Sequence, residues 1–185
     1  MTLENSSEDP ASQPPKRHEK IVYIFNLSED VWPFIQAISD PIARALEIEE
    51  NADLADKELF SIVDEPDAIF ISPKPLDPSF ISYYQEVCGV KQVTALNPKA
   101  HSGMLCRDII GDPSLMAKLV VAANSVKKLT LISYTASEQF YDLVDALRAQ
   151  GITVYTPEAP EEESGWTVNF FGSKSGIRQL AQQSA

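Results

Sequence analysis

The feature that most constrains this chain is a repeated alternation between short apolar runs and longer amphipathic stretches. Runs rich in β-branched and aromatic residues, typical of strands covered on both faces, occur at 21–27, 68–72, 91–96, 128–135 and 152–156. Stretches of helical periodicity lie between them, at 28–50, 78–89, 112–125 and 137–151. Strands that alternate with such helices form parallel sheets through crossover connections. The sequence therefore predicts an α/β fold with an open, mostly parallel, Rossmann-like sheet and helices on both faces.

Local residues indicate where these helices begin and end. Asp and Ser side chains accept hydrogen bonds from the first backbone N–H groups of a helix, whereas Gly favours the left-handed conformation that ends one. The predicted caps and stops are Ser28, Asp40, Asp112, Ser137, Gly89 and Gly151. Pro41 should kink or split the stretch 28–50. Residues 97–112 are predicted to be a long loop, and residues 166–172 a last strand.

The chain of 185 residues has room for one domain with tails. Residues 1–19 are polar and proline-rich, so we expect a disordered N-terminal tail. Residues 20–172 are expected to form the α/β domain, and residues 173–185 to begin a helix that leads toward a second domain. The N-terminal segment lacks the apolar core of a secretory signal, and no apolar run reaches the roughly 18 residues of a membrane span. These observations predict a cytoplasmic protein that has no membrane partner.

Charge and cysteine content exclude further classes of protein. The 27 acidic and 15 basic residues give a formal net charge of −12, which repels a phosphate backbone and disfavours general nucleic-acid binding. Two cysteines, Cys88 and Cys106, are too few for a disulfide scaffold or a cysteine-rich zinc site. We expect both to pack as small apolar side chains in a reducing compartment.

The usual signatures of nucleotide binding and hydrolysis are missing. The turn after the first strand contains no glycine, and Glu29 and Asp30 in it would repel a phosphate. No P-loop, nucleophile elbow or H-E-x-x-H motif occurs in the sequence. With only two histidines, a nucleophilic site is restricted to a pairing of His101 with Cys106, for which a packed cysteine beside a surface histidine is the simpler interpretation.

Two loops follow predicted strands at the edge of the sheet where α/β proteins bind ligands. The proline-rich turn from Ser72 to Pro78 presents Lys74. The long loop 97–112 carries four residues that together could hold an anion such as a carboxylate: Lys99, His101, Ser102 and Arg107. The alternative is that these polar residues are merely solvated. The candidate ligand-binding residues are thus Ser72, Lys74 and these four, with no catalytic or metal-binding residue assigned.

Three stretches carry a resemblance to a known family. They are "DAIFISPKPLDPSFISYYQEVCGV", "KLTLISYTASEQFYDLVDALRAQGITVY" and "FGSKSGIRQLAQQ". In element order and turn chemistry they resemble the N-terminal pre-ATP-grasp domain of ATP-grasp carboxylate–amine ligases of the peptide-ligase type. The likeness covers most of residues 20–185 and includes no catalytic signature.

The resemblance implies a non-catalytic accessory domain that helps to form the substrate pocket of an ATP-dependent ligase. It implies no cofactor bound by this chain alone, because ATP and magnesium are held by a downstream ATP-grasp domain of the same longer chain. A small carboxylate or amino acid is the implied substrate, faced by the turn Ser72–Pro75. Ser173, Lys174 and Gly176 are the implied domain junction.

Two alternatives remain open from the sequence. The chain could be a stand-alone α/β binding module for a small anionic ligand or a protein partner, and a small enzyme that uses residues near His101 ranks below it. For the last helix, the simpler alternative to a junction is an ordinary C-terminal helix that packs Ile177 and Leu180 on the sheet.

Overall fold

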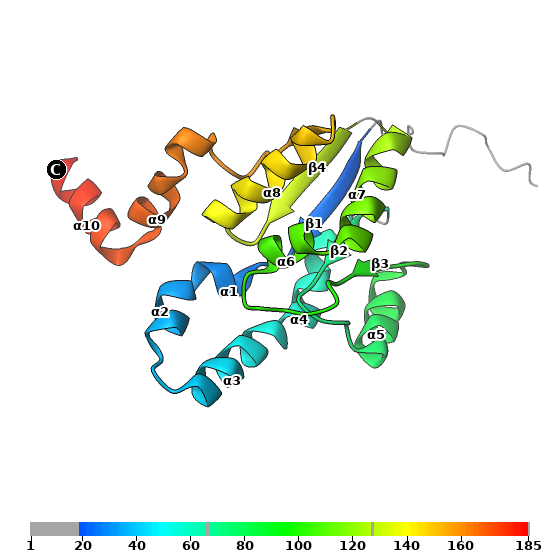
Figure 1. Ribbon diagram of the computed structural model, residues 1–185, viewed down its shortest axis with the longest axis horizontal. Helices are drawn as coiled ribbons and strands as arrows, with labels where there is room; N and C mark the ends of the chain where they lie inside the picture. Colours follow the sequence, from blue (N-terminus) through cyan, green and yellow to red (C-terminus); the bar gives the residue numbers. More distant parts are fainter. Residues whose placement is uncertain (1–18, 66, 127, 185) are drawn as a thin grey trace, which may run out of the picture.

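The computed structural model describes residues 19–65, 67–126 and 128–184. Five strands in these residues form one sheet: β1 (Lys20–Ile24), β2 (Ile69–Ile71), β3 (Thr94–Leu96), β4 (Lys128–Ser133) and β5 (Thr153–Tyr155). The strand order is β3-β2-β1-β4-β5, and every neighbouring pair is parallel (Figure 1). The predicted open, parallel α/β fold is confirmed. The order of the strands reverses between β1 and β4, which lie side by side in the middle of the sheet.

Helices make up each connection. Between β1 and β2 lie α1 (Leu27–Asp30), α2 (Trp32–Ala37), α3 (Pro41–Ala52), α4 (Ala55–Glu58) and the 3₁₀ helix η2 (Leu59–Ile62). Between β2 and β3 lies α5 (Pro78–Cys88), and between β3 and β4 lie α6 (Leu105–Gly111) and α7 (Pro113–Val126). Beyond β4 the chain forms α8 (Glu138–Ala149) before β5, then the 3₁₀ helix η3 (Glu162–Ser164), α9 (Trp166–Gly172) and α10 (Lys174–Gln183).

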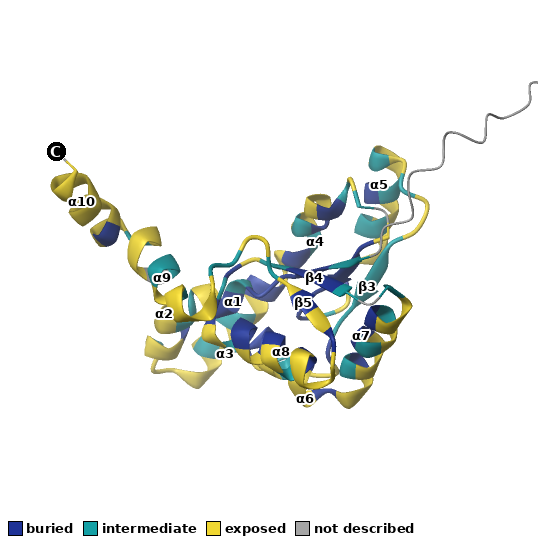
Figure 2. Ribbon diagram, turned by 90° about the horizontal axis from the view of Figure 1, so that it is seen from above, coloured by how far each residue is buried: buried dark blue, intermediate teal, exposed yellow. Residues whose placement is uncertain are grey.

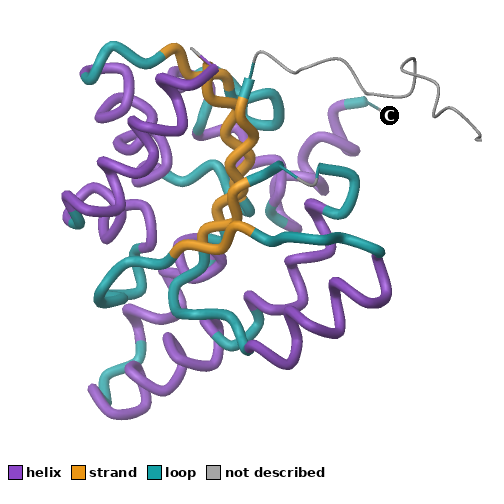
Figure 3. The backbone as a smooth tube through the Cα atoms, turned by 90° about the vertical axis from the view of Figure 1, so that its right-hand side faces the viewer, coloured by secondary structure: helices purple, strands orange, loops and turns teal. Residues whose placement is uncertain are grey.

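The sheet separates two apolar cores, because successive side chains of a strand point to opposite faces. Val22 and Ile24 of β1 pack with α6, α7 and α8, whereas Tyr23 of β1 and the next residue after the strand, Phe25, pack with α4, η2 and α5. Buried residues follow the sheet and the helix faces turned toward it, while α9 and α10 are largely exposed (Figure 2). Helices cover both faces of the sheet (Figure 3). This arrangement explains why the strand sequences are apolar on both faces.

Most of the predicted helix ends are present in the structure. The side chains of Asp40, Asp112 and Ser137 accept hydrogen bonds from backbone N–H groups at the starts of α3, α7 and α8. Gly89 and Gly151 have positive φ angles of 67° and 78° and follow α5 and α8. Each of these signals acts within a few residues of its own position.

The prediction around the end of β1 was wrong in two respects. The first strand ends at Ile24 rather than residue 27, and Ser28 is buried within α1 instead of capping a helix. The stretch 28–50, which Pro41 was predicted to kink or split, is split there, since α3 begins at Pro41; the part before it forms two short helices, α1 and α2. No side chain of the described residues caps α1. The helix is instead held by hydrogen bonds that the Glu29 carboxylate accepts from the Cys106 backbone N–H and the Ser137 hydroxyl.

Two other element predictions need correction. Residues 166–172 form the helix α9 instead of a strand, with the ring of Trp166 5.9 Å from that of Phe170 one helical turn later. The predicted loop 97–112 is a loop only to residue 104. The segment from 105 to 111 forms α6, because Leu105, Cys106 and Ile109 face the core.

Residues 1–18 of the predicted N-terminal tail lie outside the described residues. Glu19, the last residue assigned to that tail, is bound in the domain: its carboxylate lies 2.9 Å from Lys128 Nζ and accepts a hydrogen bond from Thr130. Among the described residues no single helix is long and apolar enough to span a membrane; only α6 and α7 together, which meet at a bend of 89°, pass that test.

Candidate functional site

A pocket lies where loop 97–104 and α6 meet, beyond the carboxyl end of β3. Its volume is about 290 Å³, and it is lined by Pro98, Lys99, Ala100, Arg107, Asp108, Gly111, Asp112 and Pro113. The structure thus brings to one pocket Lys99 and Arg107, two of the four residues that the sequence analysis proposed to hold an anion. Lys99 and Arg107 are exposed, and within the described parts of the chain neither forms an ion pair with a carboxylate.

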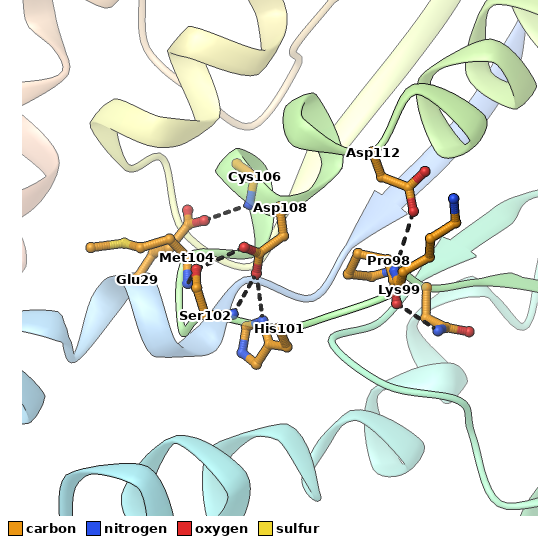
Figure 4. A network of polar contacts seen from close by, with 10 residues as sticks. Glu29, Pro98, Lys99, His101, Ser102, Met104, Cys106, Asp108 and Asp112 are labelled. Atoms are coloured by element: carbon orange, nitrogen blue, oxygen red, sulfur yellow. Dashed lines mark hydrogen bonds and ion pairs between the residues drawn. The ribbon is translucent and has the colours of Figure 1, made fainter. Parts of the chain in front are cut away.

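Asp112 fixes one wall of this pocket. Its Oδ1 accepts hydrogen bonds from the backbone N–H groups of Ser114 (3.0 Å) and Leu115 (3.2 Å), and its Oδ2 accepts one from the backbone N–H of Lys99 (3.2 Å) (Figure 4). Burial alone would raise the pKa of the Asp112 carboxyl, but these hydrogen bonds and the Lys99 charge outweigh it, so the pKa lies below its ordinary value. The aspartate therefore anchors the Lys99 backbone and leaves the Lys99 ammonium group available.

Asp108 fixes the other wall. Its carboxylate lies 2.9 Å from His101 Nδ1 and accepts hydrogen bonds from the Ser102 backbone N–H (2.9 Å) and the Ser102 hydroxyl (2.7 Å) (Figure 4). Burial alone would raise the pKa of Asp108. Hydrogen bonds from the His101 ring and the two Ser102 donors lower it by more than burial raises it, so the pKa lies below its ordinary value. His101 and Ser102, both predicted to contact a ligand, bind Asp108 and so hold the loop onto α6.

The structure gives no support to a nucleophilic pair of His101 and Cys106. The imidazole of His101 is only 11% exposed and pairs with Asp108. Cys106 lies in the core, where burial and the neighbouring Glu29 raise the pKa of its thiol well above the ordinary value. A thiol with so high a pKa is a poor nucleophile. Cys106 packs as a small apolar residue, as the sequence predicted, and Cys88 is partly buried against the other core.

The depressed pKa of Asp108 predicts a pH dependence of stability. A carboxyl group whose pKa is lower in the folded than in the unfolded chain stabilises the fold above the unfolded pKa, and this contribution is lost as the pH falls through the folded pKa. We expect the D108N variant to be less stable than the parent at pH 7 and to lose less stability between about pH 5 and pH 2. Urea unfolding across this range measures both effects. D142N, which changes an exposed aspartate on α8, should follow the parent curve, and a parallel shift of the D108N curve would contradict the assignment.

The other two predicted ligand residues lie apart from the pocket lining. Ser72 is buried, and its hydroxyl donates a hydrogen bond to the Lys74 carbonyl oxygen at 2.7 Å. The Lys74 ammonium group binds Glu49 on α3 at 2.7 Å and Asp53, the residue that follows α3. Hydrogen bonds to these two carboxylates, the one to Asp53 first, raise the pKa of Lys74. Its charge is therefore already matched within the domain, and the turn holds α3 in place.

A second set of polar residues, which the sequence analysis missed, occupies the point where the strand order reverses. Open α/β sheets bind ligands in the crevice beyond the strand ends at this point. Glu29 is buried here and accepts hydrogen bonds from the Cys106 backbone N–H (2.7 Å), Asn26 Nδ2 (2.7 Å) and the Ser137 hydroxyl. Asn26 also exchanges hydrogen bonds with the backbone N–H and carbonyl of Thr135.

The carboxylate of Glu29 thus uses hydrogen-bond donors from the first turns of α6 and α8. Such donors hold the phosphate of a nucleotide in folds of this type. The sequence alone indicates a side chain that would repel a phosphate, whereas the structure buries Glu29 at the strand-order reversal, where its carboxylate accepts these hydrogen bonds. Two of the groups that Glu29 binds, the Cys106 N–H and the Ser137 hydroxyl, lie 77 and 108 residues further along the chain. A local sequence pattern does not predict such distant partners.

The predicted junction residues form a corner between α9 and α10. The Ser173 hydroxyl accepts a hydrogen bond from the Gly176 backbone N–H at 2.9 Å and donates one to the Phe170 carbonyl oxygen at 2.7 Å. A Cβ atom on Gly176 would lie 1.7 Å from that carbonyl oxygen, so the corner requires glycine. Beyond it, Lys174, Ile177 and Leu180 are exposed on α10.

Among the described residues, no group of three or more His, Cys, Asp or Glu side chains is placed so that it could hold a metal ion. Comparison of the chain with protein-family models, with curated proteins and with solved structures finds no match to any of them.

Proposed function

We propose that this chain is a non-catalytic substrate-pocket domain of an ATP-dependent carboxylate–amine ligase of the ATP-grasp type. The observation that carries the proposal is the pocket beyond β3, where Lys99 and Arg107 lie without carboxylate partners among the described residues. In a chain with a net charge of −12, two unpaired cations in one concave site favour a small carboxylate as ligand, because Arg and Lys bind it through charge-assisted hydrogen bonds.

The walls of the pocket support this proposal. Asp112 and Asp108 hold the backbone on either side of the two cations, so Lys99 and Arg107 project from a braced loop and a helix. A preformed site loses less conformational entropy when it binds a ligand. A volume of about 290 Å³ suits a small carboxylate or amino acid rather than a nucleotide.

The nucleotide of the proposed reaction would belong to a downstream ATP-grasp domain together with its magnesium. Glu29 supports this division of roles, since its carboxylate uses the donors at the strand-order reversal. The corner at Ser173 and Gly176 also supports it, because the corner directs α10 away from the sheet.

Titration of the protein with sodium acetate and with L-alanine, followed by amide chemical shifts at constant ionic strength, tests the pocket. We expect saturable shifts in loop 97–104 and α6, and at least about tenfold weaker binding by K99A/R107A, because a charge-assisted pair contributes about 1.5–3 kcal/mol. K57A/K118A removes the same charge from exposed lysines elsewhere and should bind like the parent. Shifts that persist unchanged in K99A/R107A would contradict the proposal.

Titration with magnesium-ATP separates the proposed role from that of a nucleotide enzyme. We expect no saturable binding below about 1 mM, because Glu29 occupies the crevice. Saturable micromolar binding would exclude a non-catalytic domain. A stand-alone binding module for small anions is the second candidate, and the cations Lys99 and Arg107 beside the pocket favour it as well. Acetate binding that is unchanged when an ATP-grasp domain is supplied would favour this module over the ligase domain.

A further inference from the structure

The outer helices α9 and α10 carry an exposed apolar surface with positive charge. Five large side chains on it are between 38% and 62% exposed: Trp166, Phe170, Phe171, Ile177 and Leu180. On α10, Ile177 and Leu180 are three residues apart and share one face of the helix. Lys174 and Arg178 border that face, and no acidic residue occurs from Trp166 to Ser184. In a chain of net charge −12, this segment is basic.

A second apolar surface lies on α2 and α3. Phe34 is 76% exposed, Ile42 79% and Leu46 57%. Ile42 and Leu46 are one helical turn apart, and Glu50 lies one turn further along on the same side of α3, beside Glu49, which is paired with Lys74. Residues 32–52 contain four acidic residues and one basic residue. This surface therefore has the apolar character of the first and the opposite charge.

The two surfaces extend from the same side of the sheet without meeting (Figure 1). The extensive contacts of α10 are with α9, and those of α3 are with α1 and α2. Large apolar side chains exposed to this degree on two neighbouring elements are unusual for a surface that remains in water. Both surfaces are apolar, their charges are opposite, and they do not meet within one chain. These three properties together indicate that the α10 surface of one molecule contacts the α2–α3 surface of another.

We propose that the occupant of the α2–α3 surface is helix α10 of a second copy of this chain, and that the contact is reciprocal. In a twofold dimer each copy supplies α10 to its partner and receives the partner's α10. Ile177 and Leu180 then pack against Ile42 and Leu46, and Lys174 and Arg178 face the acidic border of α3. The pairing buries the α10 surface and the α2–α3 surface of both copies.

The corner at Gly176 sets the direction in which α10 leaves the domain. A methyl group at this position would collide with the Phe170 carbonyl oxygen, whereas a methyl group at Gly172 meets nothing within 4 Å. G176A therefore opens the corner and G172A does not. We expect G176A to weaken dimer formation and G172A to leave it unchanged.

Sedimentation equilibrium of the full chain from about 5 to about 500 µM tests the dimer, because association depends on protomer concentration. We expect a monomer–dimer equilibrium that I177D/L180D and I42D/L46D each weaken by at least about tenfold, since each removes buried apolar contact. V121D places one such negative charge at an exposed valine of α7 and should associate like the parent. A monomer throughout the range, or larger open assemblies, would overturn the proposal.

Charge reversal in trans distinguishes the second copy from any other occupant. R178E and E50K, which leave the Lys74–Glu49 pair intact, should each dimerise weakly alone. An equimolar mixture of the two should recover the parent association, because each α10 then meets an opposite charge. Amide exchange in α10 should slow as protomer concentration rises. Strong protection that is independent of concentration would assign the occupant to the same chain and refute the dimer.

Discussion

Replacing Glu29 with alanine is expected to lower the free energy of unfolding by about 3 kcal/mol, because three hydrogen-bond donors lose their acceptor in a buried site. These donors are the Asn26 amide, the Ser137 hydroxyl and the Cys106 backbone N–H. For a chain of this length the loss corresponds to a fall of roughly 6–12 °C in the unfolding midpoint. Thermal unfolding followed by circular dichroism measures it.

Two further variants show whether the loss comes from the buried network. E29Q keeps the shape and one oxygen acceptor but turns an amide N–H₂ toward other donors, so its stability should fall between those of the parent and E29A. E50A removes an exposed glutamate and should change the midpoint by no more than about 2 °C. If E29A unfolds within about 2 °C of E50A, by the same rough scaling, the stability of the fold does not depend on the hydrogen bonds of Glu29.

Gly103 is expected to be the most sensitive glycine of the loop beside the pocket. Its φ angle is +96°, and a Cβ atom would lie 2.6 Å from the ring of Trp32 and 3.2 Å from Ile48. G103A therefore combines backbone strain of about 1–2 kcal/mol with displacement of the loop from α2 and α3. We expect a total loss of about 2–3 kcal/mol, together with weaker acetate binding, because the loop carries Lys99.

G151A is the matched control for the cost of backbone strain at a positive φ angle. Gly151 has a φ angle of +78°, and a Cβ atom at this residue would meet nothing within 4 Å. G151A should therefore cost only about 1 kcal/mol and leave acetate binding unchanged. Chemical unfolding and the acetate titration of both variants provide the comparison. Equal losses of stability in G103A and G151A would show that the loop does not depend on close packing against Trp32.

Some parts of the structure could be predicted because the interactions that form them lie within a few residues. Asp40 caps Ile42, Ser137 caps Phe140, and Gly89 turns the chain immediately after α5. The pocket was partly predictable for the same reason, since Lys99 and Arg107 are eight positions apart and follow one strand. Residues 166–172 were not predictable in this way, because Trp, Val and Phe alternate as in a strand and also recur at helical spacing.

The amino-acid sequence by itself determined the fold class, the helix caps and the two cations of the pocket, because these depend on apolar periodicity and short-range hydrogen bonds. Only the tertiary structure decided which charged side chains are buried or paired, and with which partners. Glu29 reaches Cys106 and Ser137 because β1 and β4 are neighbours in the sheet, and Lys74 reaches Glu49 and Asp53 because α3 packs beside its turn. Whether an acidic or basic side chain stays in water or fills a crevice depends on which distant segments surround it, and a local pattern contains no information about those neighbours.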